Sequence, residues 1–176
     1  HSGREGGLDW YRDGKPVREE GYSTDLLARE AIRVLEQHDP ADPLFLYVPF
    51  NATHGPLAVD ENWLAPYSGI QDPNRRLKAG VTACVDAAIG RILAALRKRG
   101  MADDTLILFS SDNGGPEGRD GGGGRGGAQQ TSGGADNGPL RGSKATLYEG
   151  GVRVPAVAVW KGKLAPGTVV KIAGDE

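Results

Sequence analysis

The sequence contains few cysteine, methionine and aromatic residues. Its 176 residues include one cysteine, Cys84, so no disulfide can form within the chain. It also has one methionine, and aromatic residues make up only 6%. No uninterrupted apolar run reaches the roughly 18 residues that a membrane span needs, so we expect no membrane span. A framework of disulfides would indicate an oxidising compartment, so a single cysteine does not identify the compartment of the protein.

The chain also lacks an excess of charge of either sign. Lysine and arginine number 21 and aspartate and glutamate 23, which gives a formal net charge of -2 at pH 7. Proteins that bind polyanions non-specifically carry a positive excess, so we expect no nucleic-acid partner. The Arg-Gly-Gly stretch at 125–127 is typical of disordered RNA-binding segments, but no aromatic residue or basic cluster accompanies it.

Glycine, in contrast, is abundant. The chain has 28 glycines, roughly twice the usual share. Twelve of them lie in residues 114–138, which contain no large apolar side chain. Such a segment cannot bury enough apolar surface to offset its ordering entropy. We therefore predict a flexible loop at 114–138.

Two segments have the apolar spacing of helices. The first is predicted to begin with Ser23 or Thr24 as its cap and to end near His38. The second is predicted over residues 75–99, with Gly100 at its C-terminal end. Its apolar residues recur at three- and four-residue steps, which indicates one buried face that includes Cys84 as a core residue: Leu77, Val81, Cys84, Ala88, Ile92 and Leu96. Before the first helix, residues 1–22 favour a loop or a short hairpin.

Three short apolar runs predict strands. Residues 44–50 and 105–110 are apolar on both faces, which is typical of strands buried under helices on both sides. The third run, residues 152–160, contains Pro155 and so suits an edge position or a bulge. The order helix, strand, helix, strand, loop, strand predicts an α/β fold with a mainly parallel or mixed sheet covered by helices.

Polar residues follow two of these strands. His54 comes after the run at 44–50, and Asp112 and Asn113 come directly after the run at 105–110. A helix connects the two runs, which makes parallel strands the expectation, and the carboxyl ends of parallel strands meet at one edge of a sheet. The sequence therefore predicts that both groups lie on the same rim.

Asp112 and Asn113 are candidate metal ligands. Carboxylate and amide oxygens are the ligands that hard cations such as Ca²⁺ and Mg²⁺ prefer. Gly114 and Gly115 give the backbone the freedom to turn two neighbouring side chains toward one ion. An ordinary Asp-Asn-Gly turn accounts for the same residues equally well.

His54 and Lys144 are the other candidates. A histidine at a strand end can donate a hydrogen bond to an anionic substrate or protonate a leaving group, or it can cap local backbone. Lys144, with Arg141, is a cation among small residues and suits an anion clamp. A solvated basic turn is the alternative for that pair.

Taken together, four segments resemble the sulfatase family of the alkaline phosphatase-like superfamily. They are GYSTDLLAREAI from residue 21, PLFLYVPFNATHGPL from residue 43, AGVTACVDAAIGRILAALRKRGMADDTLILFSSDNGG from residue 79 and PLRGSKATLYEGGVRVP from residue 139. The stretch PYSGIQDPNRRLKAG from residue 66 is similar to arylsulfatase B, the N-acetylgalactosamine-4-sulfatase type.

The resemblance implies a role for each candidate. Asp112 and Asn113 match the family's second pair of ligands for a divalent cation, usually Ca²⁺. His54 matches the histidine that contacts the sulfate and assists the departing oxygen, and Lys144 matches the lysine that binds the sulfate. The implied activity is sulfuric ester hydrolysis, on a sulfated small molecule or glycan, in the periplasm, the extracellular space or the lysosome.

The chain also departs from the family pattern. The family nucleophile is a formylglycine made from the Cys or Ser of a C/S-x-P-x-R motif, which is absent here because Cys84 is followed by Val-Asp-Ala. The first pair of metal aspartates has no match either. The resemblance therefore implies that residues 1–176 form the C-terminal portion of a sulfatase catalytic domain that is inactive in isolation. A phosphonate or phosphate monoester hydrolase of the same superfamily, and a non-catalytic glycan- or sulfate-binding relative, are the alternatives. The particular ester and the oligomeric state are left open.

Overall fold

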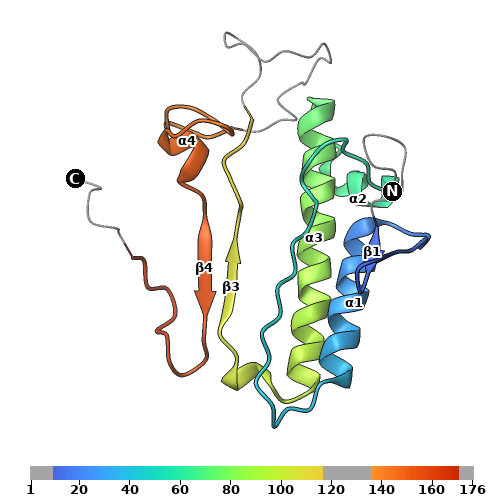
Figure 1. The fold of residues 1–176 in the computed structure, drawn as a ribbon. Helices are drawn as coiled ribbons and strands as arrows, with labels where there is room; N and C mark the ends of the chain where they lie inside the picture. Colours follow the sequence, from blue (N-terminus) through green and yellow to red (C-terminus); the bar gives the residue numbers. More distant parts are fainter. Residues whose placement is uncertain (1–9, 117–135, 171–176) are drawn as a thin grey trace.

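Helices and strands form two layers with an extended segment between them. The computed structural model describes residues 10–116 and 136–170. Helices α1 (Ser23–Gln37) and α3 (Pro73–Lys98) form one layer, and strands β3 (Ile107–Ser110) and β4 (Ala156–Val159) form the other (Figure 1). The remaining elements are short: β1 (Tyr11–Arg12), β2 (Lys15–Pro16), α2 (Glu61–Leu64), η1 (Ala65–Tyr67), η2 (Ala102–Asp104) and α4 (Glu149–Val152).

A hairpin precedes α1, as the sequence predicted for this region. Strands β1 and β2 pair in antiparallel fashion, with Tyr11 opposite Pro16. The two turn residues, Asp13 and Gly14, have φ of 51° and 74°. An Asp-Gly pair in this left-handed region is what a two-residue hairpin turn requires. The Arg12 guanidinium donates to a carboxylate oxygen of Glu30 in α1 at 3.0 Å, which ties the hairpin to the helix layer.

Both helices begin and end close to the predicted residues, but the predicted side-chain cap of α1 does not form. Tyr22 occupies the position before α1, and no side chain caps the helix. Thr24 is buried instead, with 1% of its surface exposed. At the start of α3, the Asp72 carboxylate accepts from the backbone N–H of Asn74 at 2.8 Å and of Arg75 at 3.0 Å.

The C-terminal end of α3 is closed by glycine, as predicted. Gly100 has a φ of 71°. Its N–H donates to the Arg97 carbonyl at 2.9 Å, and the N–H of Met101 donates to the Leu96 carbonyl at 3.2 Å. These two bonds form a Schellman motif, which satisfies carbonyls that the helix itself leaves unpaired.

The core lies between α1 and α3. Within residues 10–116 and 136–170, the buried apolar residues all belong to these two helices: Leu26, Ala28, Ala31, Leu35, Val81, Cys84, Ala88 and Leu96. Cys84 is 1% exposed, and burial raises the pKa of its thiol, so the prediction of a core cysteine is confirmed. By length and composition alone α3 could cross a membrane, a test that the core helices of soluble proteins also pass. Here one of its faces packs on α1.

The sheet differs from the prediction. Residues 44–50 are extended along α3 but form no strand, and Phe45 and Tyr47 are 92% and 75% exposed (Figure 1). Strand β3 forms, yet Leu108 is 71% exposed, so the expectation of strands buried on both faces is wrong for the described residues. The physical reason is that the helices cover only one side of these segments.

The pairing of β3 is also not the expected parallel one. Strands β3 and β4 pair antiparallel, with Ile107 opposite Val159 and Ser110 opposite Ala156. The chain re-enters the layer through α4, which lies at the end of β3 where β3 stops, so the next strand must run back (Figure 1). Among the described residues, the predicted mainly parallel or mixed sheet is therefore not formed, and the strands make two separate antiparallel pairs, β1–β2 and β3–β4.

Candidate functional site

The candidate metal ligands lie where the β3–β4 ladder ends. The last bonds between the two segments join the N–H of Ser111 to the Pro155 carbonyl at 3.4 Å and the N–H of Gly114 to the Gly151 carbonyl at 2.9 Å. Between them, Asp112 and Asn113 leave the ladder. The chain thus stops being a regular strand at the point where two neighbouring side chains could face one ion.

Four glycines hold this end of the sheet together. Gly114, Gly142, Gly150 and Gly151, called the glycine cluster below, bring three segments into direct backbone contact. A Cβ on Gly114 would lie 1.7 Å from the Gly150 carbonyl oxygen, and a Cβ on Gly150 would lie 1.9 Å from the Gly142 carbonyl oxygen. Only residues without a side chain permit such an approach.

A backbone contact beside the glycine cluster also positions Lys144. Its N–H donates to the Gly115 carbonyl at 3.1 Å, which fixes it beside the turn that carries Asp112 and Asn113. Asn137 strengthens this contact. Its side-chain oxygen accepts from the N–H of Gly115 at 2.8 Å, and its side-chain nitrogen donates to the Gly115 carbonyl at 3.0 Å.

Asn137 is a residue that sequence reasoning missed. It falls within the predicted flexible loop at 114–138, but residues 114–116 and 136–138 are tied to each other and to the segment of Lys144. The predicted loop is therefore too long at both ends, and its centre, residues 117–135, lies outside the described residues. An amide directly before a glycine was the available signal in the sequence.

The residue after Lys144 has a strained backbone. Ala145 has a φ of 71°, in the left-handed region that costs a residue with a Cβ about 1–2 kcal/mol. The turn around it is closed by Thr146, whose hydroxyl donates to the Ser143 carbonyl at 2.7 Å. Strain of this kind persists only where surrounding contacts enforce it, and here it sets the direction of the Lys144 segment.

We expect Ala145→Gly to raise the free energy of unfolding by about 0.5–1 kcal/mol, because glycine adopts this φ without a steric penalty. Denaturant unfolding of the purified chain measures the change. Ala158→Gly, in the exposed middle of β4, is the matched control and should lower stability by a similar amount. Equal losses for both variants would show that Ala145 is unstrained.

The oxygens of Asp112 and Asn113 are available to a ligand. The exposed Asp112 carboxylate forms no hydrogen bond or ion pair with any described residue. The Asn113 side-chain nitrogen donates to the Gly114 carbonyl at 3.1 Å, which leaves the amide oxygen as its free atom. Two oxygens fit the donor type of Ca²⁺ but supply only part of its six to eight ligands. In the described part of the chain, no group of three acidic, histidine or cysteine side chains could complete the site.

His54 lies in a turn at the end of the extended segment. Its N–H donates to the Asn51 carbonyl at 2.9 Å. The ring nitrogen Nδ1 lies 2.8 Å from the Gly55 carbonyl oxygen, which can only accept, so Nδ1 carries the proton in the neutral ring. Nε2 has no partner among the described residues and is left for a ligand.

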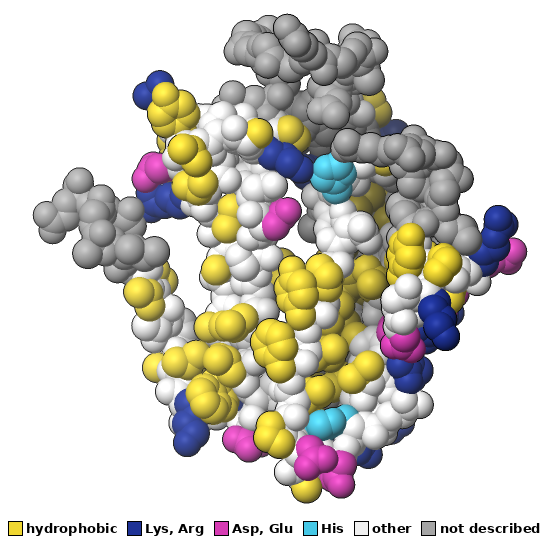
Figure 2. Space-filling model, in the orientation of Figure 1, with side chains coloured by type: hydrophobic (Ala, Val, Ile, Leu, Met, Phe, Trp, Pro, Cys, Tyr) yellow, Lys and Arg dark blue, Asp and Glu magenta, His cyan; other side chains and the backbone are white. Residues whose placement is uncertain are grey.

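The predicted juxtaposition of His54 with the other candidates remains a prediction, although the arrangement of the elements favours it. The extended segment that leads to His54 and strand β3 both run toward the same end of the molecule (Figure 1). At that end, Figure 2 shows a histidine, basic side chains and an acidic side chain on one face.

Of the two predicted anion-binding cations, Lys144 is the one whose side chain has no partner in the described part of the chain. Arg141 donates to the Tyr148 hydroxyl at 2.8 Å, and its guanidinium lies 3.8 Å from the centre of the Tyr148 ring. The half-buried Lys144 ammonium forms no hydrogen bond or ion pair with a described residue. The geometry therefore favours Lys144 as an anion ligand and gives Arg141 a packing role.

Several known proteins are similar to this chain in sequence. The protein-family description Sulfatase matches residues 3–174. Arylsulfatase J of Mus musculus is 40% identical over 132 residues, which are 75% of this chain and 20% of the relative. N-acetylgalactosamine-6-sulfatase of Homo sapiens is 30% identical over 169 residues, which are 92% of this chain and 29% of the relative.

A solved structure is similar in both sequence and fold. The crystal structure of Ps i-CgsB in complex with k-i-k-neocarrahexaose superposes with a TM-score of 0.70 at 37% identity and covers 84% of this chain. The match covers 30% of that protein. The chain thus spans between a fifth and a third of the length of these relatives.

Proposed function

Because the chain belongs to the sulfatase family, we propose that it supplies part of the active site of a sulfuric ester hydrolase acting on a sulfated sugar. The proposal rests on two charged groups at the end of β3 that have no ion-pair partner among the described residues. The Lys144 ammonium and the Asp112 carboxylate belong to segments that are hydrogen-bonded through Gly115, and neither forms an ion pair with a described residue.

Each candidate side chain has a chemical role in this proposal. The Lys144 ammonium binds a non-bridging sulfate oxygen and stabilises the charge that grows there during the reaction. The protonated His54 ring donates to the oxygen of the departing alcohol. Asp112 and Asn113 hold one side of a divalent cation, Ca²⁺, which neutralises charge on the sulfate when it is bound.

The nucleophile in this proposal comes from outside the 176 residues. Cys84 is the only cysteine, and it is buried between α1 and α3 with a raised thiol pKa, so it is not a candidate. A formylglycine from a C/S-x-P-x-R segment would fill the role. The 176-residue chain alone is then a metal- and sulfate-binding half of a site.

A sugar sulfate is the substrate class that the relatives support. N-acetylgalactosamine-6-sulfatase is among them, and Ps i-CgsB was solved with the oligosaccharide k-i-k-neocarrahexaose. The likeness of residues 66–80 to arylsulfatase B points the same way. We therefore propose a sulfated glycan or glycoside rather than a simple aryl sulfate as the natural ester.

Sulfate release by the longest natural polypeptide that carries this chain tests the proposal. We expect hydrolysis of 4-nitrophenyl sulfate and of a sulfated galactoside, loss of both activities when Ca²⁺ is chelated, and discrimination against the phosphate ester by more than about 100-fold. The 176-residue chain is expected to release no sulfate. Faster hydrolysis of a phosphate ester or phosphonate would favour the other hydrolases of the superfamily, and glycan binding without turnover would favour a non-catalytic relative.

A further inference from the structure

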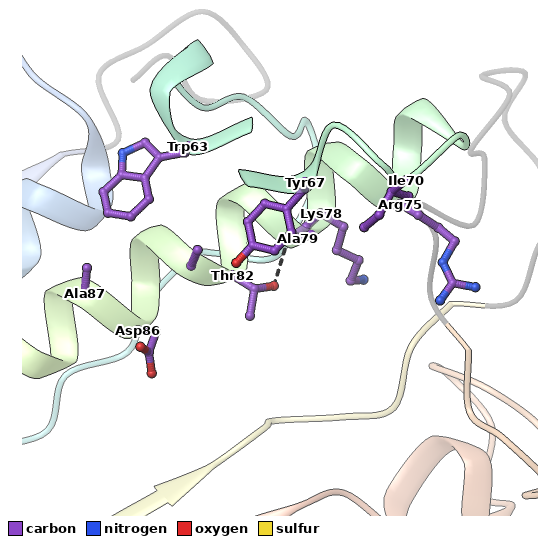
Figure 3. Close-up of a pocket in the computed structure, with 10 residues that line it drawn as sticks. Trp63, Tyr67, Ile70, Arg75, Lys78, Ala79, Thr82, Asp86 and Ala87 are labelled. Atoms are coloured by element: carbon purple, nitrogen blue, oxygen red, sulfur yellow. Dashed lines mark hydrogen bonds between the residues drawn. The ribbon is translucent and has the colours of Figure 1, made fainter. Parts of the chain in front are cut away.

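A groove on α3 lies apart from the candidate site. It has a volume of about 690 Å³ and is lined by residues of α2, of η1, of the turn that follows η1, and of α3 as far as Ala87 (Figure 3). None of the predicted site residues lines it. Along α3 the groove extends from Arg75 to Ala87, and twelve residues of helix span roughly 18 Å at 1.5 Å per residue. This length suits an elongated ligand better than a small ion.

Two cations that have no partner among the described residues line the groove. The side chains of Arg75 and Lys78 form no hydrogen bond or ion pair with any described residue. Figure 3 shows both extending from α3 in the same direction. Lys78 is half-buried, and the loss of hydration lowers the pKa of its ammonium. An anion beside Lys78 would replace the interactions with water that burial removes.

Aromatic rings line the same groove. Trp63 and Tyr67 are half-buried, so each leaves part of its ring surface open. The C–H-rich face of a pyranose ring packs well on such amphipathic aromatic surfaces, and pockets that bind organic ligands combine them with a few polar groups.

Polar groups suited to sugar hydroxyls complete the lining. The Thr82 hydroxyl donates to the Lys78 carbonyl at 2.8 Å, which leaves its lone pairs as acceptors. Asp86 is exposed on the same side of α3 and has no partner among the described residues. Both groups can accept hydrogen bonds from sugar hydroxyls.

We propose that this groove binds a sulfated stretch of a glycan chain, with Arg75 and Lys78 on sulfate groups and Trp63 against a sugar ring. The inference rests on the proposed function, because a sugar sulfate as substrate implies neighbouring sugars that also need a binding surface. It assigns to the α3 groove a binding step that is separate from the chemistry at Lys144.

Binding of a sulfated galactan hexasaccharide to the 176-residue chain tests this inference. Tryptophan fluorescence reports on Trp63, and Trp63→Phe, which keeps an aromatic ring, identifies its share of the signal. We expect Arg75→Gln and Lys78→Gln each to weaken binding about tenfold, which is about 1.4 kcal/mol. Arg97→Gln, at an exposed position of α3 outside the groove, should leave the affinity unchanged.

Three results would overturn the inference. One is equal affinity for the desulfated hexasaccharide, since the cations would then have no role. Another is unchanged affinity in both Arg75→Gln and Lys78→Gln, with thermal unfolding confirming that the variants fold. The third is full displacement by single-stranded DNA of equal charge, which would show simple polyanion binding. Failure of the proposed hydrolysis is a separate result, because groove binding is measured without turnover and through residues that take no part in the proposed chemistry.

Discussion

Gly150→Ala is expected to lower the free energy of unfolding by at least about 3 kcal/mol. The new Cβ would lie 1.9 Å from the Gly142 carbonyl oxygen and 2.6 Å from its carbonyl carbon. Both are backbone atoms, so no side-chain rotation can relieve the clash. The segment of Gly142 must move, and with it the hydrogen bond from the Gly150 N–H to the Arg141 carbonyl at 2.8 Å.

Denaturant unfolding measures the Gly150→Ala effect, and Gly90→Ala is its control. A Cβ on Gly90 meets no atom within 4 Å, and the residue lies in the exposed part of α3. Gly90→Ala should therefore raise stability by roughly 0.5–1 kcal/mol through helix propensity. If Gly150→Ala unfolded at the same denaturant concentration as the unaltered chain, the glycine cluster would not be the rigid junction described above.

Lys144→Ala, in the longest natural polypeptide that carries this chain, is expected to lower kcat/KM for a sulfate ester by about 100- to 1,000-fold. The reason is the loss of a cation that interacts more strongly with the transition state, where charge on the sulfate oxygens grows, than with the bound ester. Because kcat and kcat/KM should fall together, steady-state kinetics separate this role from simple substrate binding. Lys144→Arg should restore little activity, since a planar guanidinium does not replace a compact ammonium.

Lys163→Ala is the matched control for Lys144→Ala. Lys163 is exposed beyond β4, away from the glycine cluster, and makes only a backbone hydrogen bond. Its removal should leave kcat/KM unchanged. A loss of less than about threefold for Lys144→Ala would remove Lys144 from the chemistry and favour the solvated-turn interpretation of its segment.

The helices could be predicted from the sequence because their signals are local. Apolar residues at three- and four-residue steps placed α1 and α3 to within two residues at each end. The cap of α1 was wrong because Thr24 serves the core rather than the helix end. Burial by a partner element overrides capping preference, and only the folded structure shows where the partner lies.

The strands were harder to predict because pairing is not local. The run at 44–50 has the composition of a buried strand, but a strand forms only beside another one, and none of the described segments pairs with it. The direction of β4 was likewise set by the connection through α4, which the apolar pattern of residues 152–160 does not reveal. Composition therefore predicted strand character but not sheet topology.

Candidate ligands could be proposed from residue types, whereas the backbone packing around them could not be predicted. Asp112, Asn113, His54 and Lys144 were named from the oxygen, imidazole and ammonium groups they carry. In Gly150 and Gly151 the sequence shows only flexibility, yet both are buried in close backbone packing. A single sequence does not distinguish a glycine in a flexible loop from a glycine packed against two backbone carbonyls.

A structure of the calcium-loaded protein with bound sulfate tests the central claim most directly, using the longest natural polypeptide that carries this chain. We predict Ca²⁺ within about 2.3–2.6 Å of carboxylate and amide oxygens of Asp112 and Asn113. We also predict the Lys144 ammonium and a His54 ring nitrogen within hydrogen-bonding distance, about 2.7–3.2 Å, of sulfate or ester oxygens. A cation bound without Asp112 and Asn113, or a sulfate bound away from Lys144, would contradict the claim.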